Sequence, residues 1–127
     1  MTQSVTCAII ENKNRVLVVQ RSEKMRLPLK WEFPGGKVEN GESEEESIVR
    51  EIKEELNLDI EVSKRLNPSI FHYPNISIEL IPFLAKLVGG QIRLSEHTDF
   101  KYLVKDKLLN LDWAEADIPI VKEYLNL

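Results

Sequence analysis

The 127-residue sequence has little cysteine and no long apolar run. Its one cysteine, Cys7, excludes a framework of internal disulfides, and its apolar surroundings favour a buried thiol in a reducing compartment. No apolar segment approaches the roughly 18 residues of a membrane span, and the N-terminus lacks the basic-then-apolar pattern of a secretion signal. We therefore expect a cytoplasmic protein without a membrane partner.

The chain also lacks an excess of positive charge. It has 17 Lys and Arg against 21 Asp and Glu, a net charge of −4, which argues against binding to a nucleic-acid polymer because that requires a basic surface. No repeat, low-complexity tract or linker divides the sequence, and its length suffices for one sizeable core. We expect a single domain over residues 1–127, as a monomer or a homodimer.

Carboxylates, by contrast, are concentrated in one place. Residues 39–55 contain eight acidic and two basic side chains, a local balance of −6, so the rest of the chain sums to +2. Three glycines (Gly35, Gly36 and Gly41) precede or interrupt this segment and allow tight turns. Carboxylates beside glycine turns are typical of a site for a hard divalent cation such as Mg²⁺.

The acidic segment is predicted to form a helix. Ser43 followed by Glu46 is a capping-box pattern, and Asn57 tolerates the left-handed conformation found just past a helix C-terminus. An apolar stripe is expected from Ile48, Val49, Ile52 and Leu56. At 100° per residue Glu51, Glu54 and Glu55 cluster on another flank, where like charges cost ~0.2–0.5 kcal/mol per pair. Taken alone, such a flank could also be a solvated helix face.

The loop and helix together resemble the Nudix box. Gly36 is followed after five residues by Glu42, and after seven more by Arg50-Glu51-Ile52-Lys53-Glu54-Glu55-Leu56-Asn57-Leu58. This follows the pattern G-x5-E-x7-R-E-U-x-E-E-x-G-U, where U is apolar, except that Asn57 replaces the last glycine. The stretch Trp31-Glu32-Phe33-Pro34-Gly35-Gly36 extends the similarity toward the MutT-like branch.

The resemblance implies an α/β fold: a Nudix-type α/β/α sandwich with a mixed β-sheet between the box helix and a C-terminal helix. The order of expected elements is compatible with it. Strands are predicted over residues 5–10, 15–19, 58–62, 69–73, 76–88, 91–94 and 100–104, the first two forming a hairpin. A helical turn is predicted over residues 105–109, and a terminal helix over 114–125.

By resemblance, the box helix would hold Mg²⁺ or Mn²⁺. The ligands would be Glu51, Glu54 and Glu55 together with the Gly36 carbonyl. Glu96 lies where MutT-like enzymes supply a further metal-binding carboxylate, although its spacing alone makes it an ordinary loop acid.

The proton acceptor is left open among Glu51, Glu54 and Glu96. Arg50 belongs to the same catalytic group, and we expect it to orient the glutamates rather than to touch the substrate.

The expected substrate is a small nucleoside triphosphate. Arg21 directly follows a predicted strand and begins a basic segment that suits a polyphosphate; by resemblance it would reach the nucleotide. Gly35, Gly36 and Lys37 would line the same site.

Base recognition is expected from Asp117, which lies where relatives of the MutT-like branch contact the base. An ionised Asp only accepts hydrogen bonds, which fits the donors of guanine or of cytosine without separating them. Tyr73 or Trp113 could stack on the base or belong to the core.

These residues lead to a hypothesis of metal-assisted hydrolysis of a nucleoside triphosphate to a monophosphate and pyrophosphate. The leading substrate is an oxidised purine nucleotide such as 8-oxo-dGTP. Its hydrolysis would give the protein a role in nucleotide-pool sanitation and DNA repair. CTP or a modified dCTP is the alternative. A Nudix domain that binds nucleotide without turnover, as a sensor, is less favoured because every box carboxylate is present.

Overall fold

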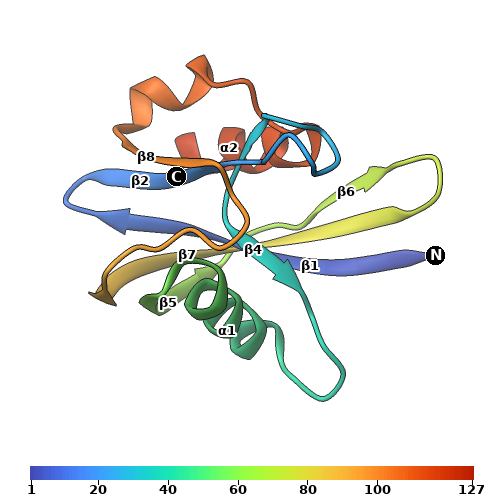
Figure 1. Cartoon of the computed structure of the whole chain (residues 1–127), viewed down its shortest axis with the longest axis horizontal. Coiled ribbons are helices and arrows are strands. Elements are labelled where there is room, and N and C mark those ends of the chain that lie inside the picture. Colours follow the sequence, from blue (N-terminus) through green and yellow to red (C-terminus); the bar gives the residue numbers. More distant parts are fainter.

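A mixed β-sheet separates two helices in the computed structural model, which describes all residues 1–127 (Figure 1). The strands are β1 (Thr2–Asn12), β2 (Arg15–Gln20), β3 (Trp31–Glu32), β4 (Gly35–Lys37), β5 (Leu58–Arg65), β6 (Ser69–His72), β7 (Ser77–Gly90) and β8 (Asp99–Leu103). The helices are α1 (Glu44–Leu56), α2 (Ile118–Leu125) and the short 3₁₀ segments η1 (Lys105–Asn110) and η2 (Glu115–Asp117). Neither α1 nor α2 has the length and apolar character needed to cross a bilayer.

The sheet follows the order β3-β2-β1-β7-β5, with β4 added to β1, β6 to β7 and β8 to β2. β1 and β7 run parallel, in register from Thr2 beside Ser77 to Glu11 beside Lys86. All other strand pairs are antiparallel. The α/β class and the mixed sheet between box helix and C-terminal helix are therefore confirmed.

Alternation along the strands builds a separate core on each face of the sheet. Cys7 and Ile9 of β1 join the cluster under α2, whereas Ala8 and Ile10 join the cluster over α1. Successive side chains of a strand point to opposite faces, so a run of buried residues serves both layers. Figure 1 shows the consequence, with α1 and α2 on opposite sides of the sheet.

Helix α1 begins and ends as its sequence predicts. The Ser43 hydroxyl accepts from the Glu46 N–H at 3.1 Å, and the Glu46 carboxylate accepts from the Ser43 N–H at 2.8 Å, which completes the capping box. Asn57 follows in the left-handed conformation, with φ of 59°. The stripe differs at one position: Val49 is 42% exposed, while Ser47 is buried in its place against β1 and β4.

The predicted hairpin is also present, with a tighter turn than the sequence suggested. β1 extends to Asn12 and pairs with Arg15, leaving only Lys13 and Asn14 between the strands. Both have positive φ (52° and 66°), as the two-residue turn that matches the twist of a hairpin requires.

Two predicted elements differ from the structure. Residues 91–94 form no strand, because β7 is already paired with β1 on one edge and with β5 as far as Gly90 on the other. The segment instead fastens to the end of α1, where the Arg93 N–H donates to the Leu56 carbonyl. The terminal helix begins as η2, and regular α-helix starts only at Ile118, beside Pro119, whose ring is tolerated in a first turn.

Candidate active site

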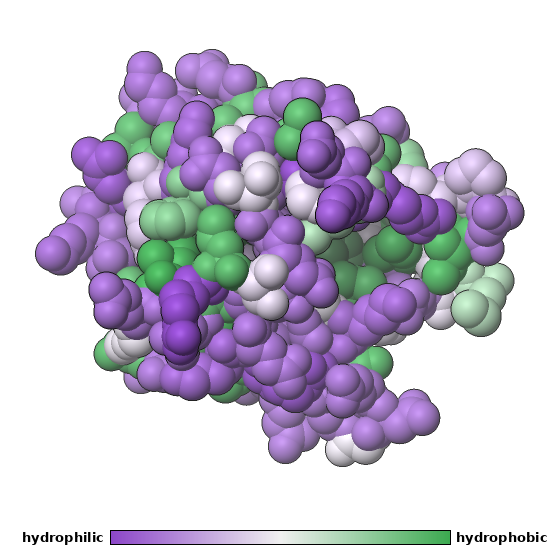
Figure 2. All heavy atoms as spheres, in the orientation of Figure 1, coloured by the Kyte–Doolittle hydropathy of each residue, from purple (hydrophilic) through white to green (hydrophobic).

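A cavity of about 610 Å³ lies along β1, β4 and α1. Most of the residues selected from the sequence line it: Arg21, Gly35, Gly36, Lys37, Glu51, Glu55, Glu96 and Asp117. A smaller cavity of about 120 Å³ shares Arg21 and Asp117 and is bordered by Tyr73. The space-filling view shows a mainly hydrophilic face with a hollow in which hydrophobic atoms are visible (Figure 2).

The glycine loop brings backbone into direct contact with an acidic side chain. A Cβ on Gly36 would lie 2.0 Å from an oxygen of Glu51, and one on Gly35 would lie 1.9 Å from the Thr6 carbonyl oxygen. Backbone therefore excludes a larger residue at Gly35, whereas a larger residue at Gly36 would displace the Glu51 carboxylate. The Thr6 hydroxyl donates to the Gly36 carbonyl at 3.3 Å, which fixes the carbonyl selected as a metal ligand.

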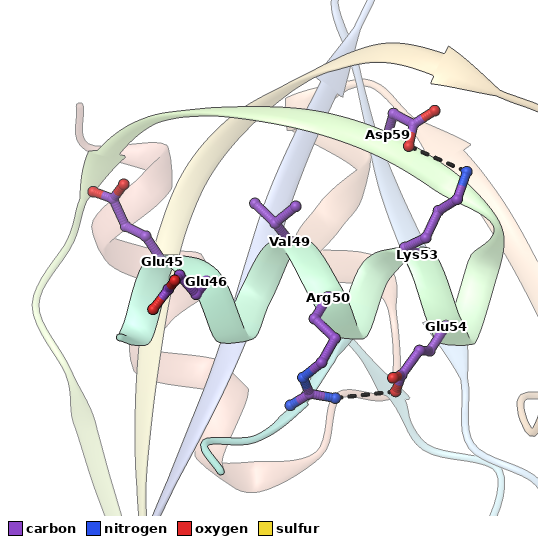
Figure 3. Close-up of a pocket in the computed structure, with 7 residues that line it drawn as sticks. All are labelled: Glu45, Glu46, Val49, Arg50, Lys53, Glu54 and Asp59. Atoms are coloured by element: carbon purple, nitrogen blue, oxygen red, sulfur yellow. Dashed lines mark hydrogen bonds and ion pairs between the residues drawn. The ribbon is translucent and has the colours of Figure 1, made fainter. Parts of the chain in front are cut away.

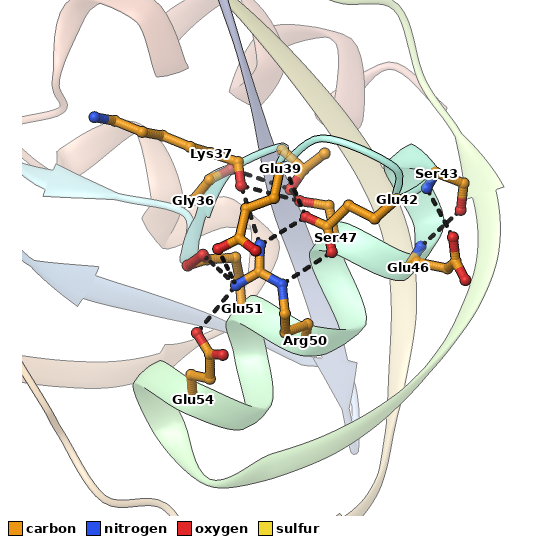
Figure 4. A network of polar contacts seen from close by, with 11 residues as sticks. Gly36, Lys37, Glu39, Glu42, Ser43, Glu46, Ser47, Arg50, Glu51 and Glu54 are labelled. Atoms are coloured by element: carbon orange, nitrogen blue, oxygen red, sulfur yellow. Dashed lines mark hydrogen bonds and ion pairs between the residues drawn. The ribbon is translucent and has the colours of Figure 1, made fainter.

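Arg50 organises the acidic side chains around the loop (Figure 4). Its guanidinium donates twice to Glu42, at 2.9 and 2.7 Å, and its Nη1 donates to Glu51 at 2.8 Å and Glu54 at 3.0 Å. Its Nη2 also donates to the Lys37 carbonyl at 3.1 Å. The Arg50 hydrogen bonds, followed by the Glu39 N–H, lower the pKa of Glu42 to about 2. This arrangement agrees with an orienting role.

The three glutamates of the box do not share one environment. Glu51 and Glu55 line the cavity. The side chain of Glu54 is 59% exposed and lies on the outer groove of α1, where Arg50 and Lys53 form ion pairs (Figure 3). Only two of the three glutamates expected to cluster therefore face the cavity. Glu54 lies outside it and is connected to Glu51 through Arg50.

Glu55 has a carboxylate oxygen that the protein itself does not satisfy. Its Oε2 is buried and has no hydrogen-bond partner. Burial raises its pKa, and the charges of Glu96 and then Glu51 raise it further. As the side chains stand, no three acidic, imidazole or thiol groups converge closely enough to hold a metal ion. Nevertheless, an all-oxygen donor set with an orphaned carboxylate oxygen fits a hard divalent cation.

The wall of the cavity also contains a partly buried polar network that sequence reasoning missed. Glu32 bonds Arg21 through one oxygen, at 2.9 Å, and His97 through the other, at 2.8 Å. The only sequence signals were the position of Glu32 within the motif before Gly35 and that of His97 next to Glu96. No spacing rule brings residues 21, 32 and 97 together.

Asp117 lines the cavity in surroundings that bear on its protonation. Its side chain lies between both cavities, the residue is 4% exposed, and Oδ2 accepts from the Phe33 N–H at 2.9 Å. Burial, and then the charge of Glu32, raises its pKa well above the ordinary value. The neutral acid is thereby favoured, and it can donate a hydrogen bond as well as accept one.

The two candidate stacking residues are now separated. Trp113 is buried, packs against Phe33 with ring centroids 4.9 Å apart, and donates to the Leu108 carbonyl at 2.7 Å, so it belongs to the core. Tyr73 borders the smaller cavity, with the Arg26 guanidinium 5.2 Å from its ring centre.

Cys7 is a buried free thiol, as predicted, and burial raises its pKa.

Comparison with known proteins identifies the family. The NUDIX domain model matches residues 1–124. The chain belongs to the Nudix hydrolase family. These enzymes generally use divalent metal ions, and the chain is a hydrolase of the diphosphate-cleaving type.

Three relatives illustrate how close this Nudix chain is to known proteins. It is 34% identical over 120 residues to "Putative 8-oxo-dGTP diphosphatase 2" of Mycobacterium tuberculosis, covering 92% of this chain and 84% of that protein. It is 32% identical over 126 residues to "CTP pyrophosphohydrolase" of Escherichia coli, covering 97% and 91%. The solution structure of MutT from Staphylococcus aureus superposes with a TM-score of 0.81 at 39% identity, covering 99% and 97%.

Proposed function

We propose that the chain is a Mg²⁺-dependent pyrophosphohydrolase that cleaves a nucleoside triphosphate to a monophosphate and pyrophosphate, acting as one unit over residues 1–127. The observation that carries the proposal is the single cavity that joins Glu51, Glu55 and Glu96 at one end to Arg21 and Asp117 at the other. A site with anionic oxygens beside a guanidinium suits a cation–polyphosphate complex.

The carboxylates that face the cavity would hold the cation. Glu51 and Glu55, the Gly36 carbonyl and Glu96 form this set, and Glu54 joins it only through Arg50. Bound Mg²⁺ or Mn²⁺ would neutralise phosphate oxygens and lower the pKa of a coordinated water. Arg50 orients Glu51 through the 2.8 Å hydrogen bond.

The proton acceptor is proposed among the carboxylates that border the cavity. Of the three candidates from the sequence, Glu51 and Glu96 meet that condition, whereas Glu54 points to the outer groove. A general base must reach the proton that it accepts, so its position outweighs its membership of the motif.

The other end would bind the nucleotide. Arg21, with Gly35, Gly36 and Lys37 along the loop, would face the phosphates, and Tyr73 with Asp117 would face the base in the smaller cavity. We propose 8-oxo-dGTP as the substrate, with a role in sanitation of the cytoplasmic nucleotide pool, because curated relatives carry that activity in their names. CTP or a modified dCTP is the second candidate, supported by the relative named "CTP pyrophosphohydrolase".

The test is a nucleotide panel assayed for pyrophosphate release with Mg²⁺, with Mn²⁺ and with chelator. It should contain 8-oxo-dGTP, dGTP, CTP, 5-methyl-dCTP and a nucleoside diphosphate sugar. Monophosphate and pyrophosphate from 8-oxo-dGTP, with kcat/KM at least about tenfold above dGTP, is the expected result. The purine assignment is replaced by the cytosine one if CTP or 5-methyl-dCTP has the highest kcat/KM.

A matched pair of variants separates an enzyme from a binding-only sensor. Glu55→Gln removes a carboxylate from the cavity, and Glu61→Gln removes one from the exposed face of β5. Hydrolysis lost in the first and kept in the second supports the enzyme. Nucleotide binding without turnover in the unaltered chain, with every metal tested, would overturn it in favour of the sensor.

A further inference from the structure

Glu32 has a different partner on each of its carboxylate oxygens. Oε1 accepts from Nη1 of Arg21 at 2.9 Å, and Oε2 is 2.8 Å from Nε2 of His97. The side chains are 21% (Arg21), 18% (Glu32) and 5% (His97) exposed, so water competes little for these bonds. Glu32 therefore has one preferred orientation and ties its two partners together.

His97 depends on Glu32 for its position. A carboxylate only accepts, so Nε2 carries the proton in this bond. The other ring nitrogen, Nδ1, is buried without any partner. Glu32 thus supplies the single hydrogen bond of this buried ring.

The ring in turn holds the tip of the loop that carries Glu96. The Ser95 N–H donates to the Glu55 carbonyl at 3.1 Å, and the Thr98 N–H donates to the Gln20 carbonyl at 3.0 Å. Between these anchors, the backbone groups of Glu96 and His97 make no hydrogen bond to other backbone groups. The side-chain bond from His97 to Glu32 is what fastens this stretch to the cavity wall.

On the other side, Arg21 closes the loop over residues 22–30. Its N–H donates to the Lys30 carbonyl at 2.8 Å, its carbonyl accepts from the Leu29 N–H at 3.1 Å, and its Nε donates to the Arg26 carbonyl. Leu27 and Leu29 have φ of 48° and 63°, a costly conformation for leucine that persists only where the surroundings hold it. Met25 and Leu27 of this loop border the two cavities.

We propose that Glu32 is a positioning residue that couples Arg21, at the nucleotide end, to the loop that carries Glu96, at the metal end. Loss of the carboxylate frees the guanidinium to leave its place and frees the imidazole to release the loop. This inference rests on the proposed function, because it assigns the two ends to nucleotide and cation.

A double-mutant cycle tests the coupling. Arg21→Gln and His97→Phe are made singly and together, first with Glu32 present and then in the Glu32→Ala background. The kcat/KM of each variant is measured with 8-oxo-dGTP and with CTP. With Glu32 present, the two changes in kcat/KM depart from additivity by at least about threefold, as expected for members of one network. In the Glu32→Ala background they add within about twofold.

Two further measurements, the KM for the nucleotide and the dissociation constant for Mn²⁺, should change in ways that a merely structural role would not produce. His97→Phe raises KM for the nucleotide, although the ring bonds only Glu32. Arg21→Gln raises the Mn²⁺ dissociation constant, measured by electron paramagnetic resonance without substrate. Glu32→Gln fills the same volume but offers only one acceptor oxygen, so its KM and Mn²⁺ dissociation constant should lie between those of the unaltered chain and those of Glu32→Ala. Glu61→Gln should change neither quantity.

Nuclear magnetic resonance of the unliganded protein keeps the inference separate from the proposed function. The His97 Nε2–H signal should shift in Arg21→Gln, because the two groups share one carboxylate. An unchanged signal, or additive kinetics in folded variants with Glu32 present, overturns the coupling. If no nucleotide is hydrolysed, the proposed function fails, while the resonance shift still decides whether Glu32 links Arg21 to His97.

Discussion

The two ends of the cavity are built in different ways. Most of the proposed metal end comes from one continuous stretch, in which Gly36 of β4 faces Glu51 and Glu55 of α1, and only Glu96 is added from a distant loop. The proposed nucleotide end gathers Arg21, Glu32 and Asp117 from three separate places in the sequence, and Glu32 links it to His97 of the Glu96 loop. A helix and the loop before it can define a cation site locally, whereas the nucleotide end exists only once the sheet has formed.

The ends also differ in how fully their polar groups are satisfied. At the proposed metal end Glu55 keeps a buried oxygen without a partner, and burial, followed by the charges of Glu96 and Glu51, raises its pKa. At the nucleotide end Arg21 already donates to Glu32, and Asp117 already accepts from the Phe33 N–H. A cation would therefore offset both the desolvation and the repulsion of carboxylates at one end, whereas the other end is already organised to receive a ligand.

The largest expected effect comes from Gly36→Ala. The new Cβ would fall 2.0 Å from Glu51 Oε2, the mobile end of a side chain, so the carboxylate moves while the fold stays intact. Displacement of a reacting group by about 1 Å can cost on the order of a hundredfold in rate. We expect kcat to fall by at least about that factor with little change in Tm. Gly89→Ala is the control, because its Cβ meets nothing closer than 3.5 Å.

The nucleotide end should respond in KM rather than in kcat. Tyr73→Leu removes the ring beside the smaller cavity, and stacking of a base on an aromatic side chain contributes about 1–3 kcal/mol. KM for the preferred nucleotide should therefore rise by about 5- to 150-fold. Tyr73→Phe keeps the ring and should leave KM nearly unchanged. An equal loss in both variants would show that the hydroxyl, not the ring, binds the substrate.

The loop and helix of the proposed metal end were predictable because the information that shapes them is local. Ser43, Glu46 and Asn57 define the helix ends through neighbours three or four residues away, and the structure reproduces those caps. Gly36 and Glu51 lie on consecutive elements, so the motif already specifies their approach. The error at Val49 arose because a stripe read at 100° per residue does not say which edge of the stripe the sheet will cover.

The nucleotide end was only partly predictable, since its contacts depend on strand order. Arg21 was found because it follows a strand, but its pairing with Glu32 requires β2 and β3 to be neighbours, as they are in the register that sets Gln20 beside Trp31. The expected strand at 91–94 failed for a related reason, because β7 had no free edge. Local patterning does not report which edges are already occupied.

Arg50→Lys sharpens the comparison, because it removes the guanidinium that holds Glu42 and leaves the residues that line the cavity unchanged. Lysine cannot reproduce the paired hydrogen bonds to Glu42. The pKa of Glu42 is about 2 in the fold against an ordinary 4.5, so its stabilisation is present above pH 4.5 and is lost as the pH falls toward 2. The variant should raise that pKa and shift acid unfolding, followed by circular dichroism, to higher pH.

The matched control for this prediction is Lys53→Ala. It removes the exposed ion pair with Asp59 on the outer groove of α1, and exposed pairs contribute little to stability. Its acid midpoint should equal that of the unaltered chain. Equal midpoints for all three proteins would contradict the role given to Arg50.

The smallest effect is expected from Asp117→Asn, and it is visible only through its dependence on pH. Burial and the charge of Glu32 raise the pKa of Asp117 above its ordinary 3.8, so the folded chain holds this proton more tightly than the unfolded chain. The contribution of Asp117 to stability is therefore present below pH 3.8 and is lost as the pH rises through its folded pKa. Asparagine does not titrate and still offers an oxygen to the Phe33 N–H. Its advantage over the parent in free energy of unfolding, measured with urea, should be near zero at pH 4 and grow as the pH rises toward 8. A constant difference across that range would mean that Asp117 is ionised and fully supported in the fold, and the nucleotide end would then present only an acceptor to the base.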